Sequence, residues 1–341
     1  VMAAMTRARA GLDGVPSRLM IDYYRQRASA GLIISEGIAI SPMARGYLAT
    51  PGLFTPDQVE GWRPITDAVH EAGGKIMAQL WHVGRISHPD MLPGRRAPFG
   101  PSPLQAASAV YAGDGFLPCA VPQEMTIDDI RQTVAEFASS AAAARSAGFD
   151  GVQIHAGNGY LPDQFLRDST NKRTDDYGGT IENRARFLLE VVAAVVAVVG
   201  RDIVSVRIAP GTNVNDISDS DPQPLFTALV RSLGEIGIAF LDVVEGATTG
   251  PRDIGIDPQI VRRAFSGPYM GNNGYTRALA LADRSAGKIE LVGFGRAFIS
   301  NPDLVERLQH DWPLVLDDRE TYYGGDAHGY TDYPSYEAPA R

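Results

Sequence analysis

The chain has 341 residues, of which 44% are apolar, and its formal net charge is −9 at pH 7. That length suits two ordinary domains or one large α/β barrel, and the apolar fraction is enough for a sizeable core. The acidic balance argues against a nucleic-acid partner, which would need a basic surface. The single cysteine, Cys119, excludes an internal disulfide framework and a cysteine-based zinc cluster.

The longest apolar run covers residues 191–199, far short of the roughly 20 residues that span a bilayer. The first residues lack the cationic and apolar regions of a signal peptide. We therefore expect a soluble, cytoplasmic protein without a membrane partner. The sequence begins without an initiator Met, inside an expected strand, so we also expect a shortened form of a longer protein.

Short apolar runs alternate with helical patterns along the whole chain. Eight strands are expected, at residues 1–5, 31–40, 75–82, 148–156, 203–210, 239–246, 268–274 and 289–296. Eight helices are expected, at residues 16–30, 56–72, 126–147, 181–200, 223–236, 257–265, 275–287 and 302–310. Nearly continuous apolar strands that alternate with helices predict parallel strands buried on both faces. A closed (β/α)₈ TIM barrel is the simplest α/β topology for that count.

One connection is much longer than the others. Residues 83–125, rich in Pro and Gly, separate the third expected strand from the third expected helix. Connections of this length are usually functional lids or disordered segments. We expect a cap over the barrel mouth, as an excursion within one barrel domain that spans residues 1–341. A second polar run, which follows "HAGNGY" (155–160), is expected to form neither helix nor strand.

Polar and small residues stand where the expected strands end. In a barrel of this kind the active site lies at the carboxyl ends of the strands. His155, Asn158 and Tyr160 follow the fourth expected strand within six positions. The residues at the other strand ends are Gly37, Gln79, Trp81, His82, Arg207, Glu245, Asn273, Gly274, Gly295 and Arg296. We expect these side chains to converge at the barrel mouth.

The "HAGNGY" segment combines complementary chemistry. His155 and Asn158 each offer an N–H donor, and two donors aimed at one point suit a carbonyl, nitro or phenolate oxygen that gains negative charge. Tyr160 holds its proton at neutral pH and could donate it. A hydrogen-bonded core histidine is the alternative for His155. His82 and His155 could also share a metal ion, although no H-x-H or H-E-x-x-H spacing is present.

Two Gly-rich segments follow the last two expected strands. They are "GNNGY" (271–275) and "LVGFGRAFISNPDL" (291–304). Small residues let backbone N–H groups approach a phosphate, and the loops after strands seven and eight are the usual phosphate site of such barrels. Ordinary turn glycines are the alternative. Arg207 could place a positive charge beside an electron-rich ring, or pair with a carboxylate within the barrel.

The pattern H-x-x-N-G-Y-L-x-x-Q-F-L…N-x-R-x-D-x-Y-G-G-x-x-x-N-R-x-R-F, which starts at His155, resembles the signature of the old yellow enzyme family of FMN-dependent ene-reductases. The resemblance is strongest to the bacterial N-ethylmaleimide reductase-like branch, and Thr6 stands where another branch has Cys. It extends through "MAAMTRAR" (2–9), "YYRQRASAGLIISEG" (23–37), "QLWHVGRISHP" (79–89), "GRAFISNPDLVERL" (295–308) and "AHGYTDYPSY" (327–336).

The resemblance implies that NADPH or NADH reduces FMN at the barrel mouth. FMN then passes hydride to the β-carbon of an activated alkene, such as an enone, a maleimide or a nitroalkene. It implies that His155 and Asn158 bind the substrate oxygen and that Tyr160 protonates the α-carbon. The residues implied to contact FMN are Ala3, Ala4, Thr6, Gly37, Gln79, Arg207, Gly274, Gly295 and Arg296. Those implied to line the substrate pocket are Trp81 and Tyr323.

A single phosphate site without a Rossmann G-x-G-x-x-G motif predicts non-covalent FMN rather than FAD. The expected partners are small electrophilic alkenes and NAD(P)H, with no metal, in a monomer or homodimer. The sequence departs from the family pattern at Ala4, where many members have Pro, at Gly157, where many have Ala, and in lacking a front segment. Two alternatives stay open: a metal-dependent hydrolase or lyase that uses His82 and His155, and a barrel that no longer turns over.

Overall fold

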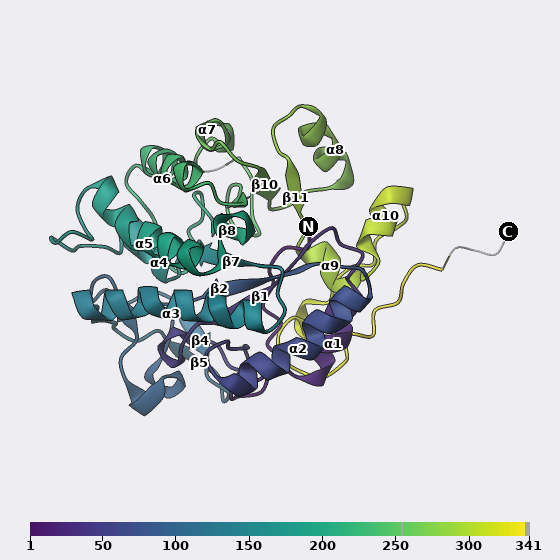
Figure 1. Cartoon of the computed structure of the whole chain (residues 1–341), viewed down its shortest axis with the longest axis horizontal. Helices are drawn as coiled ribbons and strands as arrows, with labels where there is room; N and C mark the ends of the chain where they lie inside the picture. The colour runs from purple at the N-terminus through teal and green to yellow at the C-terminus, as the bar shows by residue number, and fades with distance from the viewer. Residues whose placement is uncertain (254, 338–341) are drawn as a thin grey trace.

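The computed structural model describes residues 1–253 and 255–337. Its central sheet has the strand order β1-β2-β7-β8-β9-β10-β11, and all neighbouring strands are parallel (Figure 1). The strands are β1 (Ile33–Ala39), β2 (Ile76–Trp81), β7 (Gly151–Ala156), β8 (Val204–Ile208), β9 (Phe240–Val244), β10 (Tyr269–Asn272) and β11 (Leu291–Gly293). Every residue from β1 to β10 in this sheet is buried. Both faces of the sheet are therefore covered, as the apolar runs predicted.

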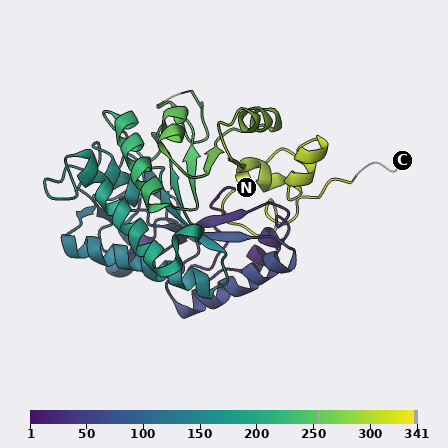
Figure 2. The same ribbon diagram turned by 45° about the horizontal axis from the view of Figure 1, so that its top comes forward.

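Helices alternate with these strands at all the expected places. In Figures 1 and 2 they lie around the outside of the curled sheet. They are α1 (Arg18–Arg25), α2 (Pro56–Glu71), α3 (Ile127–Ser146), α5 (Ile181–Val199), α6 (Pro222–Ile236), α7 (Pro258–Ala264), α8 (Arg277–Ser285) and α10 (Leu304–His310). Two shorter helices, α4 (Leu161–Leu166) and α9 (Arg296–Ser300), were not expected.

The amino-terminal residues form only a bridge, and the expected strand at residues 1–5 is wrong in length. Met2 pairs in parallel with Ile33 on one side and with Phe294 on the other. Its N–H donates to the carbonyl of Leu32 at 2.9 Å. Residues 4–8 then leave the sheet and line the cavity described below, which is why the strand is so short. Met2 nevertheless links the two edge strands of the sheet.

The long connection at residues 83–125 contains regular structure of its own. β3 (Phe99–Gly100) pairs in parallel with β6 (Gln123–Glu124), and β4 (Ala109–Tyr111) forms an antiparallel hairpin with β5 (Phe116–Pro118). Two 3₁₀ turns, Pro89–Met91 and Pro93–Arg95, precede them. The hairpin lies in the lower part of Figure 1, below α3 in that view. The role of this excursion as a cap stays a prediction.

The polar run after "HAGNGY" was expected to lack regular structure, and this is wrong for its first six residues only, because residues 167–180 form neither helix nor strand. α4 begins directly after Tyr160, and all six of its residues are buried. A helix of less than two turns is too short for its apolar periodicity to be recognised in a sequence. Asp163 in this helix forms a buried ion pair with Arg167 at 2.8 Å, and its carboxylate also accepts a hydrogen bond of 3.0 Å from the Gly159 N–H. The hydrogen bond from Gly159 to Asp163 therefore holds the "HAGNGY" loop in place against α4.

Two buried arginines near the amino terminus hold a segment from the other end of the chain. Arg7 donates hydrogen bonds to the carbonyls of Tyr322 at 2.9 Å and Gly329 at 2.8 Å. Arg9 donates to the carbonyls of Thr321 at 2.9 Å and Asp326 at 3.1 Å. These bonds fix residues 321–329 against residues 7–9, beside the central cavity.

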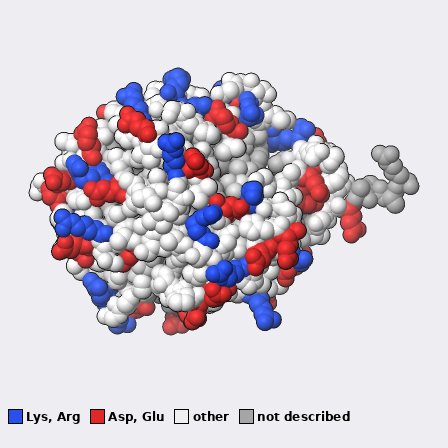
Figure 3. All heavy atoms as spheres, in the orientation of Figure 1, with Lys and Arg blue, Asp and Glu red and all other residues white. Residues whose placement is uncertain are grey.

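The surface shows no large field of one sign on the face that Figure 3 draws, where acidic and basic side chains are interspersed. Within residues 1–253 and 255–337, no helix combines the length and the apolar character that crossing a bilayer requires.

Candidate active site

A cavity of about 1040 Å³ opens at the carboxyl ends of the parallel strands. The structure brings nearly all the predicted site residues to its walls. They are Ala3, Ala4, Thr6, Gln79, Trp81, His155, Asn158, Tyr160, Arg207, Gly274, Gly295, Arg296 and Tyr323. Tyr323 is 69% exposed and therefore lies at the rim rather than deep inside.

Three residues from the expected strand ends do not line this cavity. Gly37 lies beneath Trp81, and a Cβ at Gly37 would stand only 2.6 Å from the Trp81 ring. Glu245 is buried and accepts a hydrogen bond of 2.9 Å from the Tyr275 hydroxyl. Since Gly37 packs below the indole, its direct contact with a cofactor stays a prediction.

His82 is the third, and it is a buried structural residue. Its Nδ1 accepts a hydrogen bond of 3.0 Å from the N–H of Gly84, and burial lowers its pKa to about 3. The centroid of its ring lies 6.5 Å from that of Phe99, and His82 does not line the cavity to which His155 contributes. The described parts of the chain contain no group of three His, Cys, Asp or Glu residues placed to hold a metal ion.

His155 ends β7 with one ring nitrogen already occupied. Its Nδ1 accepts a hydrogen bond of 3.4 Å from the N–H of Gly157, two residues on. Burial, together with the charge of Arg207, lowers its pKa well below the ordinary value, so the ring is neutral. A neutral imidazole that accepts at Nδ1 carries its proton on Nε2. His155 therefore offers an N–H donor to the cavity.

The side-chain amide of Asn158 is oriented by a hydroxyl group that donates a hydrogen bond to its oxygen. Its side-chain oxygen accepts a hydrogen bond of 2.6 Å from the Thr248 hydroxyl, and its backbone carbonyl accepts one of 2.8 Å from the amide of Asn215. The side-chain NH₂ of Asn158 is left for the cavity. His155 and Asn158 thus each present an N–H donor to the same cavity.

Tyr160 stands at the start of α4 within a group of aromatic rings. Its hydroxyl lies 3.2 Å from that of Tyr47, and its ring contacts Trp81 edge-on at a centroid distance of 5.0 Å. Burial raises the pKa of Tyr160 above its ordinary value, so the hydroxyl keeps its proton at neutral pH. Sequence reasoning missed Tyr47, which stacks on Trp81 at 5.3 Å; its segment after β1 has no recognisable motif.

The deep part of the cavity is polar and partly unsatisfied. Gln79 reaches it from β2, and Arg207 reaches it from β8. The Nε of Arg207 is buried and has no hydrogen-bond partner within the described residues. A buried donor without a partner is costly, so this nitrogen suits a ligand that brings an acceptor.

The Gly-rich loops form one end of the same cavity. Asn273 has a φ of 96°, and its side chain holds the loop by donating to the carbonyls of Glu245 at 2.7 Å and Ala247 at 2.8 Å. Gly295 leaves open space, because a Cβ there would meet only Met5, at 3.6 Å. Arg296 is exposed and forms no ion pair with any residue that the structure describes. This end therefore suits an anionic group.

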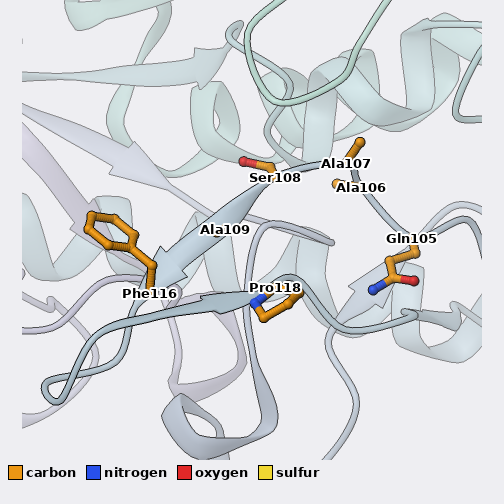
Figure 4. A pocket seen from close by; sticks show the side chains of 7 residues that line it. All are labelled: Gln105, Ala106, Ala107, Ser108, Ala109, Phe116 and Pro118. Atoms are coloured by element: carbon orange, nitrogen blue, oxygen red, sulfur yellow. The ribbon is translucent and has the colours of Figure 1, made fainter.

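The hairpin β4–β5 borders two hollows. Ala109, Tyr111 and Phe116 line the main cavity. A second, open depression of about 720 Å³ lies on the excursion itself (Figure 4). It is lined by Gln105, Ala106, Ala107, Ser108, Ala109, Phe116 and Pro118. None of the predicted site residues lines the second depression.

Comparison with known families decides what this cavity serves. Residues 1–314 match the NADH:flavin oxidoreductase / NADH oxidase family. The chain belongs to this family. The predicted flavin oxidoreductase, with FMN as cofactor and NAD(P)H as reductant, is thereby confirmed. The alternative of a metal-dependent hydrolase or lyase is set aside.

Relatives of this flavin oxidoreductase match over almost their whole length. A putative 12-oxophytodienoate reductase 5 of Oryza sativa subsp. japonica is 42% identical over 340 residues, which cover 98% of this chain and 90% of the relative. The 12-oxophytodienoate reductase 2 of Arabidopsis thaliana is 39% identical, covering 100% of this chain and 92% of the relative.

Solved structures agree with this assignment. An old yellow enzyme homologue from Zymomonas mobilis superposes with a TM-score of 0.95 at 44% identity, covering 98% of this chain and 95% of the other. Morphinone reductase in complex with tetrahydroNAD superposes with a TM-score of 0.93 at 43% identity, covering 98% and 93%. The predicted old yellow enzyme resemblance is therefore confirmed.

Proposed function

We propose that this flavin oxidoreductase is an ene-reductase that reduces activated alkenes such as enones, maleimides and nitroalkenes. The observation that carries the proposal is the orientation of His155 and Asn158. Each has its acceptor atom occupied by a donor of the protein, so each presents an N–H to the cavity. Two N–H donors bind an oxygen conjugated with a C=C bond and stabilise the negative charge that the oxygen gains.

Tyr160 is the proton donor in this proposal. Its pKa is raised by burial, and the Tyr47 hydroxyl 3.2 Å away provides a hydrogen-bonding partner after the proton has left. A phenol that stays protonated at neutral pH can act as a general acid toward the α-carbon of the alkene. Trp81 and Tyr323 form the aromatic walls around the reacting bond.

FMN, when bound, would supply the hydride chemistry that links oxidation of NADPH or NADH to reduction of the β-carbon of the alkene. We propose that Gln79 and Arg207 bind the polar edge of its ring, which the unpartnered Nε of Arg207 supports. The phosphate would lie at the open Gly-rich end of the cavity, held by Gly274, Gly295 and Arg296. Backbone groups of Ala3, Ala4 and Gly37, with the Thr6 side chain, complete the non-covalent site.

We further infer that residues 1–3 complete a closed (β/α)₈ barrel as its eighth parallel segment. The bridges of Met2 to both edges of the sheet support this. The excursion at residues 83–125 serves as the cap of this single domain, because Tyr111 and Phe116 of its hairpin line the cavity.

The test is a visible spectrum of the FMN-loaded protein under anaerobic conditions. NADPH should bleach the flavin band, and 2-cyclohexenone should restore it with formation of cyclohexanone. A yellow protein whose flavin band responds to neither NADPH nor 2-cyclohexenone would support the alternative of a barrel that no longer turns over. A colourless protein that takes up no FMN would contradict the cofactor site.

A further inference from the structure

A line of buried polar side chains runs beneath the cavity on four neighbouring strands. Gln79 lies in register with Gln153, and Arg207 lies in register with Asp242. The Gln79 Nε2 donates to the Gln153 Oε1 at 2.8 Å, and the Gln153 Nε2 donates to the Asp242 Oδ2 at 3.3 Å. The Nη1 of Arg207 lies 3.8 Å from the same carboxylate oxygen. Gln153 and Asp242 are completely buried and do not line the cavity.

Asp242 sets the direction of this line. An ionised carboxylate only accepts hydrogen bonds, so Gln153 must turn its NH₂ toward Asp242. The oxygen of Gln153 then faces Gln79 and accepts from its NH₂. The remaining group of Gln79, its side-chain oxygen, is left for the cavity. The identity of one buried residue thus decides whether Gln79 presents an acceptor or a donor.

The contacts of Asp242 fit an ionised carboxylate. Its Oδ1 accepts a hydrogen bond of 3.2 Å from the Asn272 Nδ2, while its Oδ2 faces Gln153 and Arg207. Burial raises the pKa of Asp242, and the charge of Arg207 opposes that shift. A buried carboxylate is tolerated only when paired and hydrogen-bonded. In return, Asp242 offsets part of the positive charge that Arg207 presents to a ligand.

We propose that Asp242 is a positioning residue for FMN. It orients the Gln79 oxygen toward the N–H at the polar edge of the ring, and it moderates the charge of Arg207 and so lowers the midpoint potential of the bound flavin. The inference rests on the proposed function, because it requires that edge of FMN to lie over Gln79 and Arg207. No motif marks Asp242; its one signal is a carboxylate within the apolar run "FLDVV" (240–244).

The effect of the Asp242 charge is tested with Asp242→Asn, which removes the negative charge and keeps the shape of the side chain. The dissociation constant of FMN and the two-electron midpoint potential are measured by titration and by spectroelectrochemistry. Without the carboxylate, Arg207 should stabilise the negative charge of reduced FMN more strongly. We expect the affinity ratio of reduced over oxidised FMN to rise about tenfold, which corresponds to a potential about 30 mV higher. A midpoint potential equal to that of the parent would overturn the proposed effect of the Asp242 charge on the flavin.

The orientation of the Gln79 amide is tested with Gln153→Leu, which keeps the Asp242 carboxylate and removes the hydrogen bonds that connect it to Gln79. Oxidised FMN should bind about tenfold more weakly, while the potential should shift less than in Asp242→Asn. Ser205→Ala is the matched control, because Ser205 is buried on β8 in register with Gln153 and its hydroxyl has no partner in the described chain. It should change neither value.

These outcomes separate the inference from the proposed function. If Asp242→Asn does not fold, judged by its thermal unfolding, Gln153→Leu still decides the orientation, and an unchanged dissociation constant there overturns it. A parent protein that binds no FMN contradicts the proposed function itself. A parent that binds FMN, with both variants indistinguishable from it, overturns only the role of Asp242.

Discussion

The side-chain oxygen of Asn158 accepts its hydrogen bond from Thr248, a residue 90 positions further along the chain. Thr248 lies in the loop after β9, and its hydroxyl is also 3.1 Å from that of Thr212. Asn158 itself has a left-handed φ of 57°, which Asn tolerates better than most residues. The direction of the Asn158 amide therefore depends on a loop that carries no recognisable motif.

Thr248→Val should weaken the binding of a phenol to the FMN-loaded protein by about five- to tenfold. The reason is that the amide of Asn158 loses the bond that holds its NH₂ toward the cavity. The measurement is a phenol titration followed by long-wavelength absorption. Thr248→Ser keeps the hydroxyl and should bind phenol like the parent. Equal affinity in the Val and parent proteins would show that another group orients Asn158.

His155→Ala and Asn158→Ala should each remove one of the two donors to the substrate oxygen. We expect each to cost about 2–4 kcal/mol of transition-state stabilisation in alkene reduction, and to weaken phenol binding as well. His310→Ala removes an exposed histidine and is the control. Phenol affinity and alkene turnover that survive in both variants would place the substrate oxygen elsewhere.

Tyr160→Phe should separate the two half-reactions. Reduction of the flavin by NADPH needs no protein acid, so its rate should stay close to that of the parent. Reduction of 2-cyclohexenone needs a proton at the α-carbon and should slow by about 10²–10⁴. Stopped-flow absorption measures both rates, and equal slowing of the two would show damage to the flavin site instead.

Tyr47→Phe should have a smaller effect on the same enone step, because it removes the partner of the acid and not the acid. We expect a loss of about tenfold or less, with the stack on Trp81 retained. A larger loss than in Tyr160→Phe would make Tyr47 the donor. Quinones take their protons on oxygen, so their reduction should change little in either variant.

The buried histidines predict how stability depends on pH. Burial lowers the pKa of His82 from its ordinary 6.5 to about 3, and that of His155 is also lowered. Below about pH 6.5 these histidines bind protons in the unfolded chain but stay neutral in the folded chain. The free energy of unfolding should therefore fall as pH decreases toward 3. Each histidine contributes up to about 1.4 kcal/mol per pH unit.

His82→Asn tests this dependence, because its side-chain oxygen can still accept from the N–H of Gly84. Urea unfolding between pH 7 and pH 4 should show a slope reduced by about one proton relative to the parent. An unaltered slope in His82→Asn would mean that His82 titrates normally in the folded chain.

The sequence predicted the framework because its signals are local and repeated. Continuous apolar runs marked the buried strands, and each of the eight expected helices corresponds to a helix of the structure. The amino-terminal strand and α4 were mistaken because each is only a few residues long, and at that length tertiary contacts outweigh periodicity.

The site could be predicted only where residues carry an obvious donor or follow a strand end. His155, Asn158 and Tyr160 met that condition. Tyr47, Thr248 and Asp242 did not, because each contacts its partner side chain only in the folded chain. Their partners come from different strands and loops, so no spacing along the sequence connects them.

The bonds of Arg7 and Arg9 to residues 321–329 have a consequence for synthesis. These bonds join residues up to 322 positions apart, and residues 3–8 with Tyr322 and Tyr323 line the same cavity. At a translation rate of about 5–20 residues per second, the amino-terminal part waits on the order of tens of seconds for its counterpart. The cavity is therefore completed only after residues 321–329 have been synthesised and have docked on residues 7–9, so the earlier part of the chain cannot form the whole site by itself.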